Sequence, residues 1–155
     1  MDRLILADTE RREIKALLNV SMDIDLNETK DFELSVHRSA WDDTYQYGGY
    51  IFKPGTEIGG RIGRLNTDTA LETVKVCGLT WRGMLNRKVI EPPAGQDYRR
   101  ISGELHEVMK ELIEPEFEGL FLVSEADTGV TVKNHKFERY TDHLRRIINM
   151  LKSVK

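Results

Sequence analysis

The sequence has few of the residues that form cross-links, membrane spans or signal peptides. It contains one cysteine, Cys77, so no disulfide can form within the chain and nothing points to an oxidising compartment. Cys77 lies in an alternating stretch, residues 74–79, where a small buried side chain is expected. The apolar runs extend over only a few residues, which predicts no membrane span. Residues 1–8 are too short and too acidic for a signal peptide.

Catalytic motifs are equally scarce. The glycines form no dinucleotide or Walker pattern, and no serine lies in a nucleophile elbow. The four histidines are His37, His106, His135 and His143, and no two are spaced as zinc ligands. We therefore expect no catalytic residues, no metal and no cofactor. His143 falls in the first turn of a predicted helix, where the dipole opposes a protonated ring, and it is predicted to be solvated.

The composition is that of an ordinary globular protein. The chain has 155 residues, of which 39% are hydrophobic and 32% are charged. This length suits one domain, or one domain and part of a second. The net charge of -3 argues against a nucleic-acid partner, because neutralising phosphates requires a basic face. We expect neither a nucleic acid nor a membrane among the partners.

Two groups of polar side chains are candidates for chemistry. His37 lies close to Asp42 and Asp43 in the sequence, which allows a metal or acid–base cluster but equally a polar loop after a strand. Carboxylate pairs for glycoside hydrolysis could come from Glu114, Glu116 and Glu118. The surrounding charge run favours a solvent-facing linker for these glutamates.

A third candidate is a dense group of aromatic residues, Trp41, Tyr45, Tyr47 and Tyr50. Such residues are enriched in contact surfaces, so they could bind carbohydrate or protein. Core packing in a small β-domain is the competing interpretation. The binding interpretation predicts rings that lie exposed together on one face.

Residues 1–91 are predicted to form a β-rich domain with an antiparallel, barrel-like sheet. The clearest signal is a run of apolar residues at alternate positions. These are Ile14, Ala16, Leu18, Val20, Met22, Ile24 and Leu26. The run predicts one long strand, or two strands joined by a bulge, with one face buried; a helix over residues 10–18 is the alternative. Phe32, Leu34 and Val36 predict a returning strand that forms a hairpin with it.

Two further hairpins are expected in this domain. Lys53-Pro54-Gly55-Thr56 places proline and glycine where a type II turn requires them. Asn66-Thr67-Asp68-Thr69 marks the next turn. Glycine pairs at 48–49 and 59–60 suit the bends and bulges of a strongly curved sheet.

Pro92-Pro93-Ala94-Gly95-Gln96-Asp97 predicts a boundary, and residues 96–155 are expected to form a helix–hairpin–helix segment. Ser102 is predicted to cap a first helix that Pro115 ends. Asp127-Thr128-Gly129 is predicted to turn a hairpin between Phe121–Val123 and Val130–Val132. Thr141 or Asp142 would cap the last helix. Its apolar face would consist of Leu144, Ile147, Ile148 and Leu151. The fold class expected for the whole chain is therefore α+β, mainly β.

One stretch is more specific than these patterns. Gly78-Leu79-Thr80-Trp81-Arg82-Gly83-Met84-Leu85 continues through Asn86-Arg87-Lys88-Val89-Ile90-Glu91-Pro92-Pro93. It resembles the Gly-x-Thr-Trp-Arg-Gly-x-Leu element, with a basic residue, an aliphatic residue and Pro-Pro after it, of a tail-hub family of siphophages and prophages. This is the siphovirus gene-product-thirty-seven-like family. Shorter segments, such as Gly55-Thr56-Glu57-Ile58-Gly59-Gly60 and Ser124-Glu125-Ala126-Asp127-Thr128-Gly129, are also similar and occur in the same order.

The resemblance implies a structural, non-enzymatic part of a phage tail tip, the N-terminal portion of a hub that closes the tail tube. It implies trimers around the tail axis, with tube, distal tail and receptor-binding proteins as partners. The protein would reside in the virion, and in the host bacterial cytoplasm before assembly. Residues 96–155 would be the start of a second, truncated domain. A cell-wall hydrolase, or a carbohydrate- or protein-binding module of the tail, is the alternative function.

Overall fold

The computed structural model describes residues 3–68, 70–117, 119–138 and 142–154. The chain divides into two compact units, Met1–Met84 and Leu85–Lys155, here called unit 1 and unit 2. The division by contacts therefore falls slightly before the composition break at Pro92. In the described part of the chain, strands predominate and a few helices accompany them, which confirms the α+β, mainly β fold class.

Unit 1 is one antiparallel sheet in the order β2-β1-β5-β6-β7-β4-β3. Its strands are β1 (Leu4–Ala7), β2 (Glu13–Leu17), β3 (Ser21–Ile24), β4 (Asp31–His37), β5 (Tyr50–Phe52), β6 (Gly59–Asp68) and β7 (Thr73–Thr80). A short 3-10 helix, η1 (Arg38–Ala40), follows β4, and α1 (Trp81–Arg87) follows β7. The expected hairpin between the alternating run and the Phe32 strand is present as β3 and β4.

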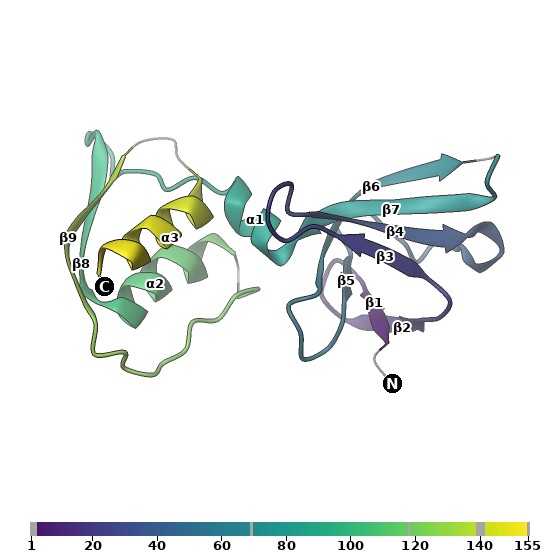
Figure 1. Ribbon diagram of the computed structural model, residues 1–155, viewed down its shortest axis with the longest axis horizontal. Helices are drawn as coiled ribbons and strands as arrows, with labels where there is room; N and C mark the ends of the chain where they lie inside the picture. The colour runs from purple at the N-terminus through teal and green to yellow at the C-terminus, as the bar shows by residue number, and fades with distance from the viewer. Residues whose placement is uncertain (1–2, 69, 118, 139–141, 155) are drawn as a thin grey trace. The chain divides into compact units, whose positions relative to one another are not determined.

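The sheet must curl, because its two edge strands are neighbours in the chain. β2 and β3 lie at opposite ends of the strand order, yet only residues 18–20 separate them. Consecutive Cα atoms are about 3.8 Å apart, so Leu17 and Ser21 lie within roughly 15 Å of each other. The two edges therefore approach one another, and the sheet has the barrel-like form that the sequence predicted (Figure 1).

The alternating run is inverted half-way along, so the prediction of one continuous buried face is wrong. In β2 the buried residue is Leu17, whereas Ile14 is 41% and Leu18 60% exposed. In β3 the even-numbered Met22 and Ile24 pack against the core. Asn19 lies between the strands with a φ of 55°, a left-handed conformation that interrupts the pleat. The two strands pair with different neighbours, β1 and β4.

The turn predictions have mixed outcomes. Gly55 has a φ of 71°, and the Thr56 amide donates to the Lys53 carbonyl at 3.2 Å, as a type II turn requires. The turn expected at residues 66–69 is wrong, because Asn66 and Thr67 continue β6 and pair with Lys75 and Val74. Thr69 lies outside the described residues.

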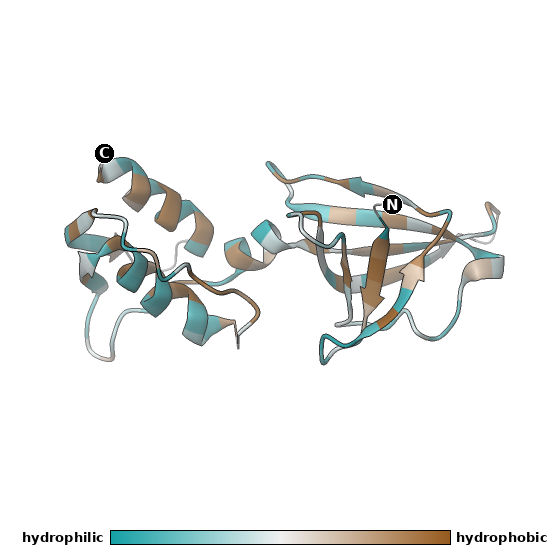
Figure 2. Ribbon diagram, turned by 90° about the horizontal axis from the view of Figure 1, so that it is seen from below, coloured by the Kyte–Doolittle hydropathy of each residue, from teal (hydrophilic) through white to brown (hydrophobic). Residues whose placement is uncertain are grey.

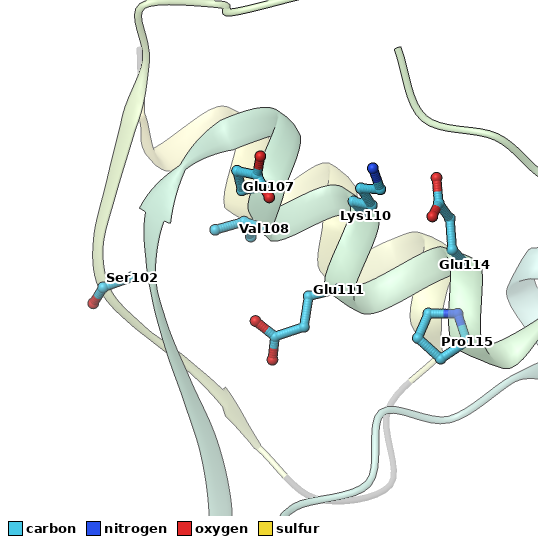
Figure 3. Close-up of a pocket in the computed structure, with 7 residues that line it drawn as sticks. All are labelled: Ser102, Glu107, Val108, Lys110, Glu111, Glu114 and Pro115. Carbon is cyan, nitrogen blue, oxygen red and sulfur yellow. The ribbon is translucent and has the colours of Figure 1, made fainter. Parts of the chain in front are cut away.

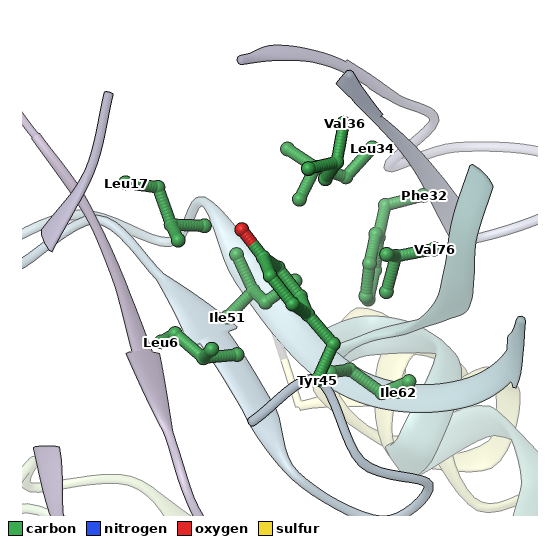
Figure 4. Packing of buried hydrophobic residues seen from close by; sticks show 9 residues of the cluster. All are labelled: Leu6, Leu17, Phe32, Leu34, Val36, Tyr45, Ile51, Ile62 and Val76. Atoms are coloured by element: carbon green, nitrogen blue, oxygen red, sulfur yellow. The ribbon is translucent and has the colours of Figure 1, made fainter. Parts of the chain in front are cut away.

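The core of unit 1 lies inside the curled sheet (Figure 4). It consists of Leu6, Leu17, Phe32, Leu34, Val36, Tyr45, Ile51, Ile62 and Val76. Every strand except the short β3 contributes, and Met22 and Ile24 of β3 pack against its margin. Burial of this set supplies the main stabilisation of the unit.

Unit 2 is a two-stranded ribbon with two helices. Its elements are β8 (Tyr98–Glu104), α2 (Leu105–Ile113), the 3-10 helix η2 (Glu114–Glu116), β9 (Thr131–Glu138) and α3 (His143–Ser153). β8 pairs with β9 in antiparallel fashion. Figure 2 shows apolar and polar residues alternating along both helices, as expected for helices with one buried face. Buried residues from all four main elements, including Ile101, Val108, Phe137 and Ile147, form its core.

The hairpin predicted at Asp127-Thr128-Gly129 is wrong. Residues 119–130 contain no strand, and β9 pairs instead with β8, which precedes α2 in the chain. The unit is therefore strand–helix–strand–helix rather than helix–hairpin–helix. Because α2 lies between β8 and β9 in the chain, no turn sequence marks their pairing. The turn residues around Gly129 therefore predicted a hairpin that does not form.

The predicted helices exist, but their caps and faces differ. The α2 N-cap is Glu104, whose carboxylate accepts from the His106 amide, whereas the Ser102 hydroxyl accepts from Asn134 in β9. Asp142 is the α3 N-cap, without a side-chain cap bond, and Thr141 lies outside the described residues. The buried face of α3 consists of His143, Arg146, Ile147 and Met150. Ile148, predicted on that face, is 41% exposed.

Candidate functional site

The four aromatic candidates do not form one exposed face. Tyr45 is 4% and Tyr50 9% exposed, while Tyr47 is 73% exposed. Trp41 is half-buried and stacks on Tyr45 with ring centroids 4.9 Å apart. Tyr50 stacks in turn on Trp81 at 6.1 Å. Tyr47 alone of the four offers its ring fully to solvent.

Trp41 and Tyr45 are held at the core by a charged neighbour. The Lys15 ammonium lies 4.7 Å from the centroid of the Tyr45 ring and bonds the Asp42 carboxylate. Burial raises the pKa of the Tyr45 phenol, and the negative charge of Asp42 adds to this. The contact ties β2 to the loop after η1, and Tyr45 lies in the core with Trp41 packed against it.

His37, Asp42 and Asp43 do not converge. The His37 Nδ1 lies 2.7 Å from the Ser39 hydroxyl, and its Nε2 lies 3.9 Å from a Glu72 carboxylate oxygen. Asp42 is engaged by Lys15 and by the Thr44 hydroxyl and amide, and these bonds lower its pKa, Lys15 most strongly. Within the described ranges, no three His, Cys, Asp or Glu side chains come close enough to hold a metal ion.

A shallow pocket of about 350 Å³ lies along α2 and is lined by three carboxylates, Glu107, Glu111 and Glu114 (Figure 3). Each of them already has a partner: Glu107 contacts His106, Glu111 accepts from Arg99 at 2.5 Å, and Glu114 accepts from the Val123 amide at 3.4 Å. Glu116 of the predicted glutamate group pairs with Lys88 at 3.6 Å. Glu118 lies outside the described residues.

A carboxylate–imidazole cluster at the start of α2 was missed by the sequence-based prediction. His106 Nδ1 contacts Glu104, and its Nε2 lies 2.9 Å from Glu107. Glu104 also accepts from the Thr128 amide at 2.9 Å and from its hydroxyl at 2.5 Å. These bonds, that of the Thr128 hydroxyl foremost, lower the Glu104 pKa to about 2. The cluster fastens residues 124–130 to α2. The spacing Glu104-x-His106 was the only signal in the sequence, and it is too common to interpret.

His143 is buried, contrary to the prediction that it is solvated. It is 2% exposed, and its ring meets Phe117 edge-to-face at 6.2 Å. Among the described residues, neither ring nitrogen makes a hydrogen bond of good geometry. Burial lowers the pKa of the imidazole, and the charges of Arg99 and Lys88 act in the same direction. The Leu112 backbone and the Glu116 carboxylate act against it.

The Thr80-Trp81-Arg82-Gly83 element connects β7 to the turn between β3 and β4. Thr80 is fully buried; its hydroxyl donates to the Lys30 carbonyl at 2.8 Å and accepts from the Gly83 amide at 3.1 Å. The latter bond is the N-cap bond of α1. The Arg82 guanidinium holds the Glu57 carboxylate at 2.7 and 3.1 Å.

Glycine is required at two positions of this region by close backbone contacts. A Cβ on Gly83 would lie 2.1 Å from the Lys30 carbonyl oxygen, and one on Gly78 would lie 2.1 Å from the Arg61 carbonyl oxygen. Each distance is far below van der Waals contact. Gly78 and the four residues Thr80–Gly83 therefore each have a packing or hydrogen-bonding role in unit 1.

No family model matches the chain, and no curated protein matches it. Of the part of the chain that the structure describes, no helix is long and apolar enough to cross a membrane.

Proposed function

We propose that this chain is a structural component of a phage or prophage tail tip, part of a hub that closes the tail tube and supports baseplate or receptor-binding proteins. The proposal rests first on the resemblance of residues 78–93 and several shorter segments to the tail-hub family. The barrel-like sheet of unit 1 is of the kind that such a hub requires.

The observation that carries the proposal is the packing of the Thr80-Trp81-Arg82-Gly83 element. This element is the central part of the resemblance. Its Thr80, Trp81 and Arg82 side chains contact Lys30, Tyr50 and Glu57, respectively, within unit 1. Such contacts build the scaffold of unit 1 and leave these side chains engaged inside it. In this role the chain is a scaffold of the virion tail, with other tail proteins and copies of itself as partners.

The proposal is tested on tail particles purified from the phage or induced prophage that encodes the chain. Antibodies against the chain should label one end of each tail in electron micrographs. If the chain is absent from purified tails, or is distributed along the tube, the proposed position in a tail-tip hub is wrong.

A further inference from the structure

Among the described residues of unit 1, three stretches of strand edge have no strand partner: the outer edges of β2 and β3, and part of β6. β5 pairs with β6 only over Gly59–Arg61, and the loop before it bonds Ile62. Over residues 63–67, no strand of the described chain pairs with the outer edge of β6. β3 likewise pairs with β4 alone. Unpaired N–H and C=O groups along such edges are templates for strand addition.

The β6 edge is exposed and carries one apolar and one basic side chain. Leu65 is 38% exposed although it lies opposite the fully buried Val76, so it points to the inner side of the sheet. Arg64 lies opposite Cys77 on the outer side, 3.2 Å from the Asn66 side-chain amide. Both Arg64 and Asn66 are exposed. This edge therefore offers a cation outside and an apolar side chain inside.

The β3 edge has the complementary pattern. Met22 lies opposite the buried Leu34 and packs against the margin of the core, which places it on the inner side. Asp23 lies opposite Glu33 on the outer side and is exposed. Each molecule therefore carries an acidic outer residue at one edge and a basic outer residue at the other.

We propose that copies of this chain associate head to tail, with the β6 edge of one molecule adding to the β3 edge of the next. An antiparallel register that sets Arg64 against Asp23 also sets Leu65 against Met22 and Asn66 against Ser21. In this register the opposite charges of Arg64 and Asp23 meet on the outer side of the sheet, and the apolar Leu65 and Met22 meet on the inner side. Like charges directly opposite one another would destabilise the pair, and opposite charges stabilise it.

Such a contact uses two different surfaces, so it is heterologous and gives a ring where the rotation closes. That this ring lies in the tail tip rests on the proposed function. The edges of β6 and β3 are then the surfaces through which copies of the hub meet. It does not depend on the aromatic residues or on unit 2.

Charge reversal tests the contact directly on the full chain. Sedimentation velocity is measured over a wide concentration range for the unmodified protein, Asp23→Arg, Arg64→Asp and the double variant. We expect concentration-dependent association of the unmodified protein, at least about tenfold weaker association in each single variant, and recovery in the double variant. Asp43→Arg and Lys133→Asp, which alter exposed charges outside both edges, are the controls and should associate normally.

Three results would overturn the inference: an unmodified protein that stays monomeric, single variants that associate normally, or a double variant that does not recover. Association that ignores both reversals would leave the proposed function intact, since copies would then meet elsewhere. Absence of the chain from tails would refute the proposed function without deciding the edge contact, which the sedimentation data decide alone.

Discussion

Thr80 holds three parts of unit 1 together. Its amide and its hydroxyl both donate to the Lys30 carbonyl, at 3.0 and 2.8 Å. The same hydroxyl accepts from Gly83. Because the side chain is fully buried, water cannot replace these bonds when the hydroxyl is removed.

Replacing Thr80 with valine keeps the side-chain shape but removes both hydroxyl bonds. We expect the free energy of unfolding of unit 1 to fall by about 1–3 kcal/mol, because the buried Gly83 amide loses its N-cap acceptor and the Lys30 carbonyl keeps only the bond from the Thr80 amide. Both tryptophans of the chain, Trp41 and Trp81, lie in residues 1–84, so urea unfolding followed by tryptophan fluorescence reports on this unit. Thr67→Val on the exposed part of β6 is the matched control; an equal effect in both variants would contradict the assigned role.

Gly83 is the second residue on which the element depends. Gly83→Ala places a methyl group against the Lys30 carbonyl oxygen, and we expect it to lower the free energy of unfolding by about 1–3 kcal/mol. Gly63→Ala is the control, because its Cβ would meet nothing nearer than the Gly78 Cα at 4.0 Å. Urea unfolding of the two variants should differ clearly; a neutral Gly83→Ala would show that the close contact is relieved at no cost.

At the scale of elements, α3 is held by a buried histidine in its first turn. The His143 amide donates to the Lys88 carbonyl at 2.9 Å, and the ring packs against Phe117. The neutral ring suits this environment. A protonated ring would be a buried cation near Arg99 and Lys88, with Glu116 the acidic group acting on it.

The pH dependence follows from the lowered pKa of His143. The unfolded chain takes up a proton near the ordinary pKa of about 6.5, whereas the folded chain does so only at lower pH. The contribution of His143 to stability is therefore fully present above about pH 6.5 and falls as the pH decreases below it. The pKa of His135 is also lowered by burial, so His135 likewise makes the protein less stable in acid. Burial acts to lower the pKa of His106, but Glu104 and Glu107 outweigh it and raise that pKa. His106 therefore has the opposite effect on stability.

Hydrogen exchange of α3, followed by mass spectrometry between pH 7 and pH 5, checks this expectation. After correction for the intrinsic pH dependence of exchange, protection of residues 143–153 should decrease with acid in the unmodified protein and change much less in His143→Leu. His37→Gln, at a largely exposed position of unit 1, should behave as the unmodified protein does. Identical profiles for all three proteins would contradict the role of His143.

The elements also show where the sequence was informative. The strand pair β3–β4 and the Gly55 turn were predictable because their signals are local: alternation, and proline with glycine at fixed turn positions. The inversion between Leu17 and Met22 was not, because it depends on the left-handed φ of Asn19, which an asparagine adopts only in some contexts. The partner of β9 was missed because pairing with β8 spans α2.

The candidate site was predictable only in part, for a related reason. His37, Asp42 and Asp43 were predicted as one possible cluster because they are close in the sequence. In the structure His37 lies near Glu72, and Asp42 binds Lys15. The burial of His143 was hidden because α3 is rotated relative to its predicted apolar face, so that His143 and Arg146 replace Leu144 and Ile148. Because His143 and Arg146 are polar, their burial could not be predicted from a pattern of hydrophobic residues.

At the scale of the whole molecule, both units have their own buried core, and unit 1 carries complementary unpaired edges. Such features suit a part that is rigid within each unit and joins copies through backbone edges. If the chain is a structural subunit of a tail tip, as we propose, its copy number per tail is fixed and low.

Quantitative mass spectrometry of purified tails, with isotope-labelled peptides of the chain and of the tube protein as standards, measures that copy number. We expect about three copies per tail, the number that the family resemblance implies for a ring on the tail axis, independent of tube length. A copy number that is far below one per tail, or that rises in proportion to the tube protein, would contradict the account.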